Sequence, residues 1–391
     1  MALRAYNDPN NPTPSQIGTQ FEEFYWQKKA LIEAKRKQYF MPLADVATQP
    51  KYYGKTMKKY HYLPLLDDRN LSTQGIDATG AQIANGNLYG SSKDMGTIPG
   101  KFPTLTEHGG RVNRVGFTRI TVEGTLEKFG FFDEYTQESM DFDSDSELMM
   151  HINREMIYGA HEMTEDALQI DLLNNAGVIV YPGAAISKAT VDKTPITYKE
   201  LLKLHLLLSN NRCPLQTMYM SGTTNIDNLT IPSSRVMFIG HELQCMVEEM
   251  VDLHGERAFI PVQKYAAGTR IMNGEIGSVG YFRMIVVPEM QHDYGAGGPA
   301  DAAGLVTHYN DGANYTLFPM LVVGHESFST IGFQSDGNVV KFKIYHKPPG
   351  EEEADRFDPY GETGFMSIKW YYGFLLLRPE RLAVVWSAAG Q

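Results

Sequence analysis

Three histidine–glutamate pairs are the first residues in this sequence whose types could do chemistry. His161–Glu162, His241–Glu242 and His325–Glu326 each place an imidazole beside a carboxylate. Those side chains bind zinc and transfer protons in metal-dependent hydrolases. A zinc-protease helix needs a second histidine four residues after the first, and none of the three pairs has one. A metal-dependent hydrolase built on these pairs therefore stands only as an alternative function.

Two further patterns begin like metal sites and then depart from the required spacing. The run Asp141–Asp145 has aspartate at every second position, as in a calcium loop, but Ser146 stands where glycine is needed and Ile152 where glutamate is needed. Helix capping explains these carboxylates better. His151 and Glu155 are four residues apart, where a surface contact along one helix is the simpler interpretation. We therefore predict no metal site.

Motifs for phosphate binding and for nucleophilic catalysis also fail. The loop Gly295–Gly304 lacks the Lys-Ser/Thr that completes a phosphate loop, and no Gly-x-Ser-x-Gly elbow occurs. The two cysteines, Cys213 and Cys245, are too few for a disulfide framework or a cysteine zinc cluster. We expect both to be unpaired, buried thiols in a chain made in a reducing, intracellular compartment. The sequence thus predicts no catalytic residue, no cofactor and no enzyme activity.

The composition is that of a folded chain with an acidic surface. The 391 residues are 42% hydrophobic and 21% charged, with a net charge of −11, and the length suits two or three domains. The negative charge argues against a general nucleic-acid binder. No apolar run reaches 18 residues, so we expect no membrane span. The N-terminus has no apolar signal core, and we expect it to be uncleaved.

The longest element expected is a helix over Asp143–Asn175. Ser144 and Glu147 form a capping box at its start, and Gly177 is placed to end it in a left-handed turn. Such a helix would be about 45–50 Å long and could serve as a spine. Apolar residues spaced by three or four form one stripe that should face a core: Leu148, Ile152, Met156, Ala160, Met163, Ala167 and Ile170. Polar residues occupy the opposite side: Arg154, Glu155, Glu162, Glu165 and Asp171.

Two alternating segments, Lys55–Leu66 and Arg119–Leu126, predict paired strands. In the second, Ile120, Val122 and Leu126 should face one way. Between the strands lies Asp67–Arg111, a glycine-rich segment with no repeating apolar face. Ordering it would cost on the order of 45 kcal/mol, which needs roughly 1,800 Å² of apolar burial. We therefore expect that neighbouring chains cover this loop if it is ordered.

The rest of the chain reads as strands separated by single helices, which predicts a mixed α+β fold. Residues 1–18 form an arm, and Phe21–Phe40 an amphipathic helix. Thr197 and Glu200 form a capping box that opens a helix with Leu201, Leu204 and Leu208 on one face. A second helix is expected over His241–Leu253. Further strands are expected at these segments: Arg235–Ile239, Gly280–Val287, Thr316–Val323, Val339–Tyr345, Gly364–Leu377 and Leu382–Trp386.

This order of parts resembles the Hong Kong 97-type major capsid proteins of tailed phages, and within them the capsid family of the schitovirus group of short-tailed phages. Three segments carry the resemblance: Asn273–Arg283 (NGEIGSVGYFR), Asp358–Gly364 (DPYGETG) leading into Ile368–Phe374 (IKWYYGF), and Leu382–Trp386 followed by Ala388 and Ala389. It spans roughly residues 20–389. Insertions at Ser72–Gly110 and His292–Gly312 depart from the minimal pattern.

The resemblance implies an N-terminal arm over 1–45 and an extended E-loop over 46–125. It implies a P-domain made of 126–176, with the spine helix, together with return strands in 340–391. It leaves 177–339 as the A-domain. In such shells the A-domains cluster around five-fold and six-fold axes, and E-loops lie across neighbouring subunits.

The implied function is that of a major capsid protein that self-assembles into the icosahedral shell around a double-stranded DNA genome. The implied partners are other copies in hexamers and pentamers, a portal protein, and a scaffold or decoration protein. DNA would be enclosed without sequence-specific binding, because an acidic wall repels the duplex. No membrane contact is implied. The protein would be assembled in the bacterial host cytoplasm and reside in the virion. A metal-dependent hydrolase and a secreted or surface adhesin are the alternatives.

Overall fold

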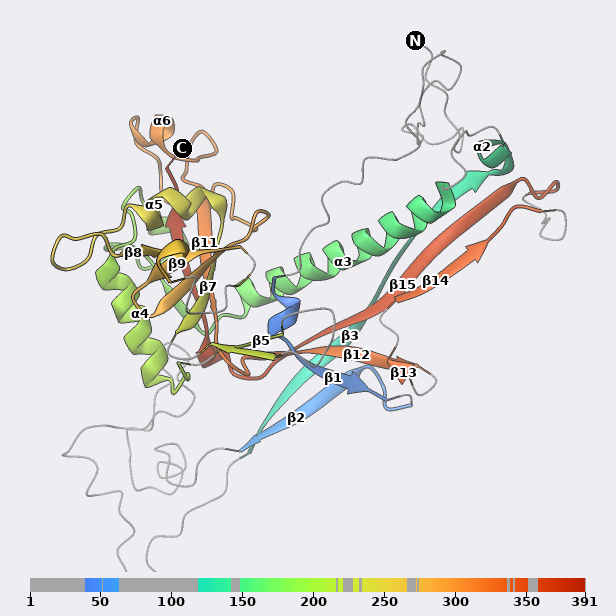
Figure 1. Ribbon diagram of the computed structural model, residues 1–391, viewed down its shortest axis with the longest axis horizontal. Coiled ribbons are helices and arrows are strands. Elements are labelled where there is room, and N and C mark those ends of the chain that lie inside the picture. Colours follow the sequence, from blue (N-terminus) through green and yellow to red (C-terminus); the bar gives the residue numbers. More distant parts are fainter. Residues whose placement is uncertain are drawn as a thin grey trace, which may run out of the picture.

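The computed structural model shows an elongated molecule with two β-sheets and a long helix between them (Figure 1). The predicted arm over 1–18, the loop Asp67–Arg111 and the capping box of Ser144 and Glu147 lie outside the described residues, as does the predicted helix Phe21–Phe40 except for its last two residues. The described residues are 39–50, 52–62, 119–141, 148–215, 217–220, 228–231, 234–265, 272, 274–335, 338–339, 342–350 and 358–390.

The first sheet has the strand order β1-β12-β15-β3-β2, with β13 added beside β12 and β14 beside β15. Only β1 and β12 pair in parallel. The predicted pairing of Lys55–Leu66 with Arg119–Leu126 is confirmed as the antiparallel pair β2 and β3. Its strands are β1 (Asp45–Gln49), β2 (Thr56–Tyr62), β3 (Arg119–Thr136), β12 (Phe328–Ser335), β13 (Asn338–Val339), β14 (Phe342–Lys347) and β15 (Thr363–Leu376).

The second sheet has the order β4-β16-β11-β7-β10-β9-β8. Its strands are β4 (Val178–Val180), β7 (Arg235–Ile239), β8 (Phe259–Pro261), β9 (Glu275–Val279), β10 (Phe282–Val286), β11 (Leu317–Val323) and β16 (Leu382–Ala388). A separate two-stranded sheet pairs β5 (Thr217–Met220) with β6 (Asn228–Ile231). The helices are α2 (Gln137–Asp141), α3 (Leu148–Asn174), α4 (Tyr198–Asn210), α5 (Gln244–Glu248) and α6 (Gly304–Thr307). The mixed α and β content agrees with the predicted class.

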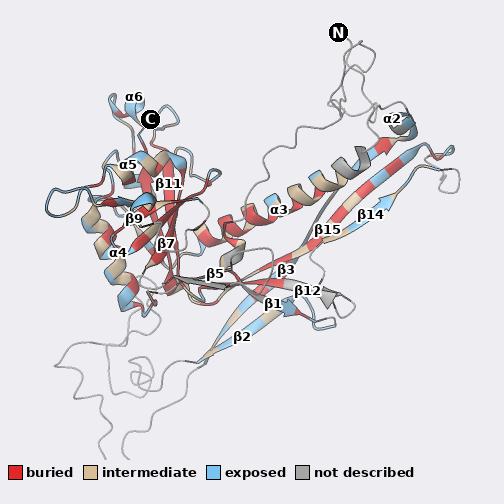
Figure 2. Ribbon diagram, viewed as in Figure 1, coloured by how far each residue is buried: buried red, intermediate tan, exposed pale blue. Residues whose placement is uncertain are grey.

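The central strands of the second sheet are buried on both faces (Figure 2). In β7, Val236 and Phe238 belong to the core shared with helix α3, whereas Met237 and Ile239 belong to a second core with α4 and α5. Strands covered on both faces have continuous apolar sequences instead of alternating ones. This explains why the sequence predicted β7, β11 and β16 from short unbroken apolar runs.

Helix α3 runs from the second sheet along β15 of the first (Figure 1). Its 27 residues make it about 40 Å long at 1.5 Å per residue. Met156, Ala160, Leu168 and Leu172 are all buried in one core that also contains Trp370 of the first sheet. The helix therefore packs against both sheets at once, as expected of a spine.

The buried stripe of α3 differs from the predicted one in its second half. Met163 and Ile170 were expected in the core, but each is 48% exposed. The buried positions there are Thr164, Glu165, Leu168, Gln169 and Leu172. Of these, Thr164, Leu168 and Leu172 continue from Ala160 at steps of four. A step of four advances about 40° beyond one full turn, so the buried face rotates around the helix as it passes from one sheet to the other.

Gly177 is needed for a different reason from the one predicted. It does not take the left-handed conformation among the positive-φ glycines of the described chain. A Cβ at Gly177 would lie 2.4 Å from the carbonyl oxygen of Pro379, and the Gly177 amide donates to that same oxygen at 3.1 Å. Only glycine lets the end of α3 approach the Pro379–Arg381 turn, where the chain crosses from β15 to β16.

The sheets divide the chain differently from the predicted boundaries. The segment 340–391 was expected as one set of return strands, but β14 and β15 lie in the first sheet and β16 in the second. Residues 328–335, where no strand was predicted, fall within the expected A-domain 177–339, yet they form β12, which pairs with β1 and β15 of the first sheet. The predicted boundary at 125 and 126 falls inside the single strand β3. The chain thus crosses between the sheets more often than the sequence indicated.

Two predicted helices pack against the second sheet, in the core that does not include α3. The capping box of Thr197 and Glu200 is present at the start of α4, and the three predicted leucines are buried. The helix expected over His241–Leu253 is shorter. It consists of a 3-10 turn over His241–Leu243 and α5, which ends at Glu248.

We predict that Ala160→Pro strongly destabilises the fold. Ala160 is fully buried in the middle of α3, and proline there removes a helical hydrogen bond and clashes with the preceding turn. The free energy of unfolding should fall by about 3 kcal/mol or more, measured by urea denaturation followed by circular dichroism. Glu155→Ala, at an exposed position of the same helix, should change it little. Equal stability of the two variants would contradict the packing of α3.

Candidate functional site

The three histidine–glutamate pairs lie on separate elements and form no joint site. His161 is on α3, where its ring packs edge-on against Phe342 at 4.7 Å. His241 starts the 3-10 turn before α5. His325 is 3.8 Å from Glu326, a long ion-pair distance at a turn between β11 and β12. The structure brings none of the pairs together.

The other sequence candidates are equally scattered. Asp141 ends α2 and accepts a hydrogen bond from Gln137 at 2.8 Å, whereas Asp143, Asp145 and the side chain of His151 lie outside what the structure describes. Among the described residues, no three His, Cys, Asp or Glu side chains are grouped so that they could hold a metal ion. No described helix is both long enough and apolar enough to cross a bilayer.

Both cysteines are free thiols, as predicted. Cys213 is buried, and burial raises the pKa of its thiol. Cys245 is exposed, contrary to the expectation of a buried position in a long helix. Leu243 and Val247, two residues to either side of Cys245, are the buried positions of this segment, so Cys245 lies on the outer side.

The carboxylate of Glu165 fixes the start of the described chain onto α3. Its Oε1 accepts hydrogen bonds from the backbone amides of Tyr39 at 2.7 Å and Phe40 at 2.6 Å. Glu165 is only 3% exposed, although the sequence placed it on the polar side of the helix. Hydrogen bonds to a charged acceptor are about twice as strong as neutral ones. This contact attaches residues 39–40, as well as the two sheets, to α3.

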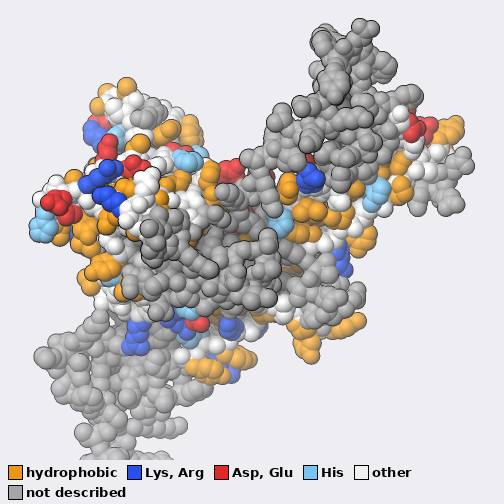
Figure 3. All heavy atoms as spheres, viewed as in Figure 1, with side chains coloured by type: hydrophobic (Ala, Val, Ile, Leu, Met, Phe, Trp, Pro, Cys, Tyr) orange, Lys and Arg blue, Asp and Glu red, His pale blue; other side chains and the backbone are white. Residues whose placement is uncertain are grey.

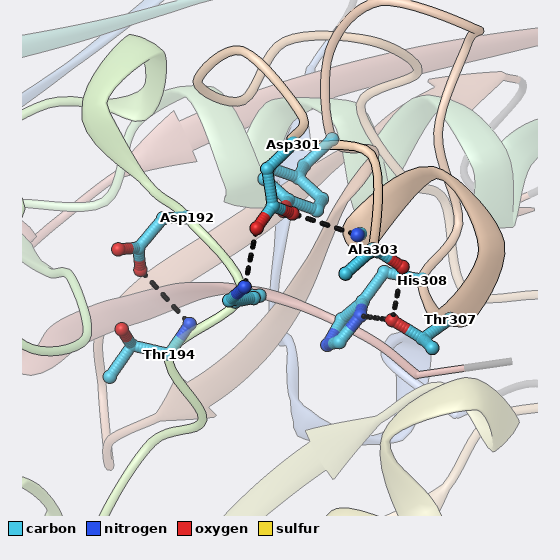
Figure 4. A network of polar contacts seen from close by, with 9 residues as sticks. Asp192, Thr194, Asp301, Ala303, Thr307 and His308 are labelled. Atoms are coloured by element: carbon cyan, nitrogen blue, oxygen red, sulfur yellow. Dashed lines mark hydrogen bonds and ion pairs between the residues drawn. The ribbon is translucent and has the colours of Figure 1, made fainter.

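A polar network holds the loops around α6 at the end of the second sheet (Figure 4). Asp301 is its centre and accepts from three donors: the Lys193 ammonium at 2.5 Å, the Gly304 amide at 2.7 Å and the Tyr315 hydroxyl at 2.9 Å. Next to it, Thr307 donates to the Ala303 carbonyl at 2.9 Å and lies 2.8 Å from His308 Nδ1.

The network stabilises the ionised form of its central acid. Lys193 contributes most, followed by the Gly304 amide and the Tyr315 hydroxyl, and together they lower the pKa of Asp301 to about 2. Burial raises the pKa of Tyr315, so the tyrosine stays a donor. A permanently ionised acid with three donors is suited to fixing loop geometry. It is a poor general acid or base at neutral pH, because a catalytic group needs a pKa near the working pH.

A second ionic cluster fixes β9 against β10. Arg283 contacts Glu275 with both ends of its guanidinium, through Nε at 2.6 Å and Nη2 at 2.7 Å. Tyr265 also donates to Glu275 at 2.7 Å. Burial and then Glu275 raise the pKa of Tyr265 to about 12. Glu275 thus accepts hydrogen bonds from both Arg283 and Tyr265, an arrangement that indicates a structural role.

One face of the sheet formed by β3, β15 and β14 exposes several aromatic side chains. Phe132, Ser367 and Tyr345 lie directly opposite one another on these three strands, so they share a face. Phe132 is 63% and Tyr345 48% exposed, and Phe365 two residues along is 37% exposed. Figure 3 shows exposed hydrophobic side chains along the extended part of the molecule formed by α3, β14 and β15. We call Phe132, Tyr345 and Phe365 the aromatic face.

The aromatic face lies opposite the side that α3 covers. Ile368 and Trp370 on the other side of β15 belong to the core that contains Met156 and Ala160 of α3. The sequence predicted β15 but not this exposed face. The first of its strands, β3, was expected to end at Leu126, before Phe132, and the strand containing Tyr345 was expected over Val339–Tyr345. Alternation in Phe129–Phe132 was the signal that could have extended β3.

Comparisons with known proteins agree on one class. The sequence profile of a family described as "Phage capsid protein" matches residues 119–387 of this chain. The major capsid protein of Pseudomonas phage KPP21 is 58% identical over 386 residues, covering 98% of this chain and 97% of that relative. This chain therefore belongs to the phage capsid protein family.

Solved capsid structures share the fold. The capsid of Ralstonia phage GP4 matches with a TM-score of 0.57 at 10% identity, over 97% of this chain and 99% of that chain. The capsid asymmetric unit of cyanophage Pam1 matches with a TM-score of 0.53 at 11% identity, over 95% and 98%. At such low identity the likeness concerns the fold alone. It shows that this chain shares its overall fold with subunits of those capsids.

We predict that Glu165→Ala loosens the N-terminal segment. The substitution leaves the buried amides of Tyr39 and Phe40 without an acceptor, which should cost about 2–4 kcal/mol of unfolding free energy. Glu165→Gln is the matched control, because its amide oxygen can still take the two short bonds that end on Oε1. Urea denaturation and limited proteolysis near 39–44 measure both. Equal effects of the two variants would show that the acceptor is unimportant.

We predict that Asp301→Asn lowers thermal stability at pH 7, and that this effect shrinks steadily as the pH falls through about 2. The folded-state pKa of Asp301 is depressed from 3.8 to about 2. Its stabilisation is therefore complete above about pH 4 and is lost as the pH falls through about 2. Melting temperatures of wild type and variant should converge over that window. Asp133→Asn, at an exposed position on β3, is the control. A difference that stays constant with pH would contradict the role of the charge.

Proposed function

We propose that this chain is the major capsid protein of a tailed, double-stranded DNA phage and that copies of it assemble into an icosahedral shell. Membership of the phage capsid family supports the class of function. The aromatic face is the feature of this chain that best supports self-assembly. Three large aromatic side chains exposed together on one sheet face are typical of a protein interaction surface.

The finer assignment is a Hong Kong 97-type fold of the schitovirus group. On this proposal the first sheet with α3 is the P-domain, and the second sheet with α4 and α5 is the A-domain. Strand β12 then joins the P-domain and β16 the A-domain, which revises the sequence boundaries. Residues 1–45 remain the proposed N-terminal arm. The proposed E-loop starts from the β2–β3 pair.

The A-domain tip would then meet other copies around five-fold and six-fold axes. The Asp301 network holds α6 and the loops around it in one arrangement, which suits a part repeated around an axis. The net charge of −11 suits a wall that encloses DNA without sequence-specific binding. Further proposed partners are a portal protein and a scaffold or decoration protein. We infer no enzyme activity, no cofactor and no membrane contact, with assembly in the host cytoplasm.

The experiment is expression of the full chain followed by negative-stain electron microscopy. Closed shells are the expected result, because neither a metal-dependent hydrolase nor an adhesin would form them. Monodisperse single subunits at all concentrations, or a metal-dependent hydrolytic activity, would contradict the proposal.

We predict that Phe132→Asp combined with Tyr345→Asp abolishes closed shells without unfolding the subunit. Both side chains are largely exposed, so the isolated subunit loses little. Burying two carboxylates in a subunit contact would cost several kcal/mol. Circular dichroism should stay unchanged while shells disappear from micrographs. Phe132→Leu keeps the face apolar and should still assemble. Normal shells from the double variant would place the contact elsewhere.

A further inference from the structure

A pocket of about 260 Å³ lies where the β2–β3 pair meets the end of β15. Lys59 and His61 of β2 line it together with Glu326 and Arg378. Val122 and Leu377 add an apolar part to the lining. None of these residues belongs to the aromatic face or the Asp301 network.

Positive charge exceeds negative charge around this pocket. Glu326 is the one acid among the described lining residues, against Lys59 and Arg378. Its carboxylate lies 3.7 Å from Arg378 Nη2 and 3.8 Å from Arg381 Nη1. These distances are within ion-pair range but longer than a hydrogen bond. Glu326 therefore offsets the two guanidiniums only weakly, and 52% of its side chain is exposed to solvent that screens it further.

The neighbouring histidine responds to the same positive potential. Burial, and then the charges of Arg378 and Arg381, lower the pKa of His61. Two cationic side chains, Lys59 and Arg378, thus line a small hollow in a chain whose net charge is −11. A group that supplies negative oxygens there would gain charge-assisted hydrogen bonds from Arg378 and Lys59.

The size and lining of the pocket indicate which oxyanion fits. Pockets for drug-sized ligands are about 300–1,000 Å³, so this one suits a single side chain. Val122 and Leu377 offer apolar contact for a methylene stem, which an aspartate or glutamate has and a phosphate lacks. The abundant source of such carboxylates near an assembling subunit is another acidic copy, with 46 Asp and Glu in each chain.

We propose that this pocket receives a carboxylate side chain from a second copy of the chain, bound between Arg378 and Lys59. This inference rests on the proposed function, because it assumes that copies meet in a shell. The bound carboxylate would form an ionic contact between subunits beside the β2–β3 pair, separate from the apolar contact of the aromatic face.

Adjacent lysines on β2 provide a matched test. Lys59 lines the pocket, whereas Lys58 points to the other face of the strand and pairs with Glu123 at 2.6 Å. The test variant is Lys59→Gln with Arg378→Gln. The control is Lys58→Gln with Arg257→Gln, which removes the same charge at exposed positions outside the pocket. Circular dichroism of unassembled subunits checks that each variant folds.

The test variant should give at least about tenfold fewer closed shells at equal protein concentration, because each charged contact is repeated in every subunit. The control should match wild type. Lys59→Arg with Arg378→Lys keeps both charges and should restore most of the yield. If the double variant fails to fold, the single variant Lys59→Gln at this exposed position gives the same comparison. Equal shell yields from test and control would overturn the proposal.

The source of the oxyanion is decided by comparing empty and DNA-filled shells. A carboxylate from a second copy requires that empty shells also depend on Lys59 and Arg378. If the test variant forms empty shells normally and loses only the filled ones, the pocket binds DNA phosphate and the proposal is wrong. Failure of the wild-type chain to form any shell would reject the proposed function itself, which is a separate result.

Discussion

The packing of helix α3 against two sheets is the constraint on which the rest of the structure depends. Its buried side chains belong to one core with Trp370 of the first sheet and Phe238 of the second. Because the sheets lie at different positions around the helix, the buried face has to rotate along its length, and the steps of four from Met156 to Leu172 provide that rotation. The two sheets and the helix therefore share one continuous core.

Polar groups on α3 add to this packing. Their hydrogen bonds select one position of the helix relative to its neighbours, which apolar contacts alone would define less sharply. Glu165 binds the Tyr39 and Phe40 amides. Asp171 accepts a hydrogen bond from Tyr372 at 2.7 Å, and burial raises the pKa of both groups. Each contact joins the helix to a segment more than a hundred residues away. Buried polar groups with partners cost little and fix one arrangement, since any shift leaves them unsatisfied.

Covering the first sheet on one side only has a consequence for assembly. Strands β3, β14 and β15 carry aromatic residues on both faces, and α3 can cover just one of them. The second sheet, by contrast, is covered on both faces by α3 and by α4 with α5. An architecture with one complete sheet and one half-covered sheet suits a subunit that completes its burial against other copies, and family membership agrees with that interpretation.

The sequence by itself determined the elements whose signals are local. Unbroken apolar runs predicted β7, β11 and β16, the Thr197–Glu200 capping box predicted the start of α4, and the long periodic segment predicted α3. Tertiary structure alone decided which sheet each strand joins, because that depends on distant partners: β12 pairs with β1 and β15, whereas β16 pairs with β11 and β4. It also decided that Glu165 is buried, that Gly177 is needed beside Pro379, and that Lys59 and Arg378 share a pocket. In each case the deciding contact joins residues far apart in the chain, where neither spacing nor composition carries information.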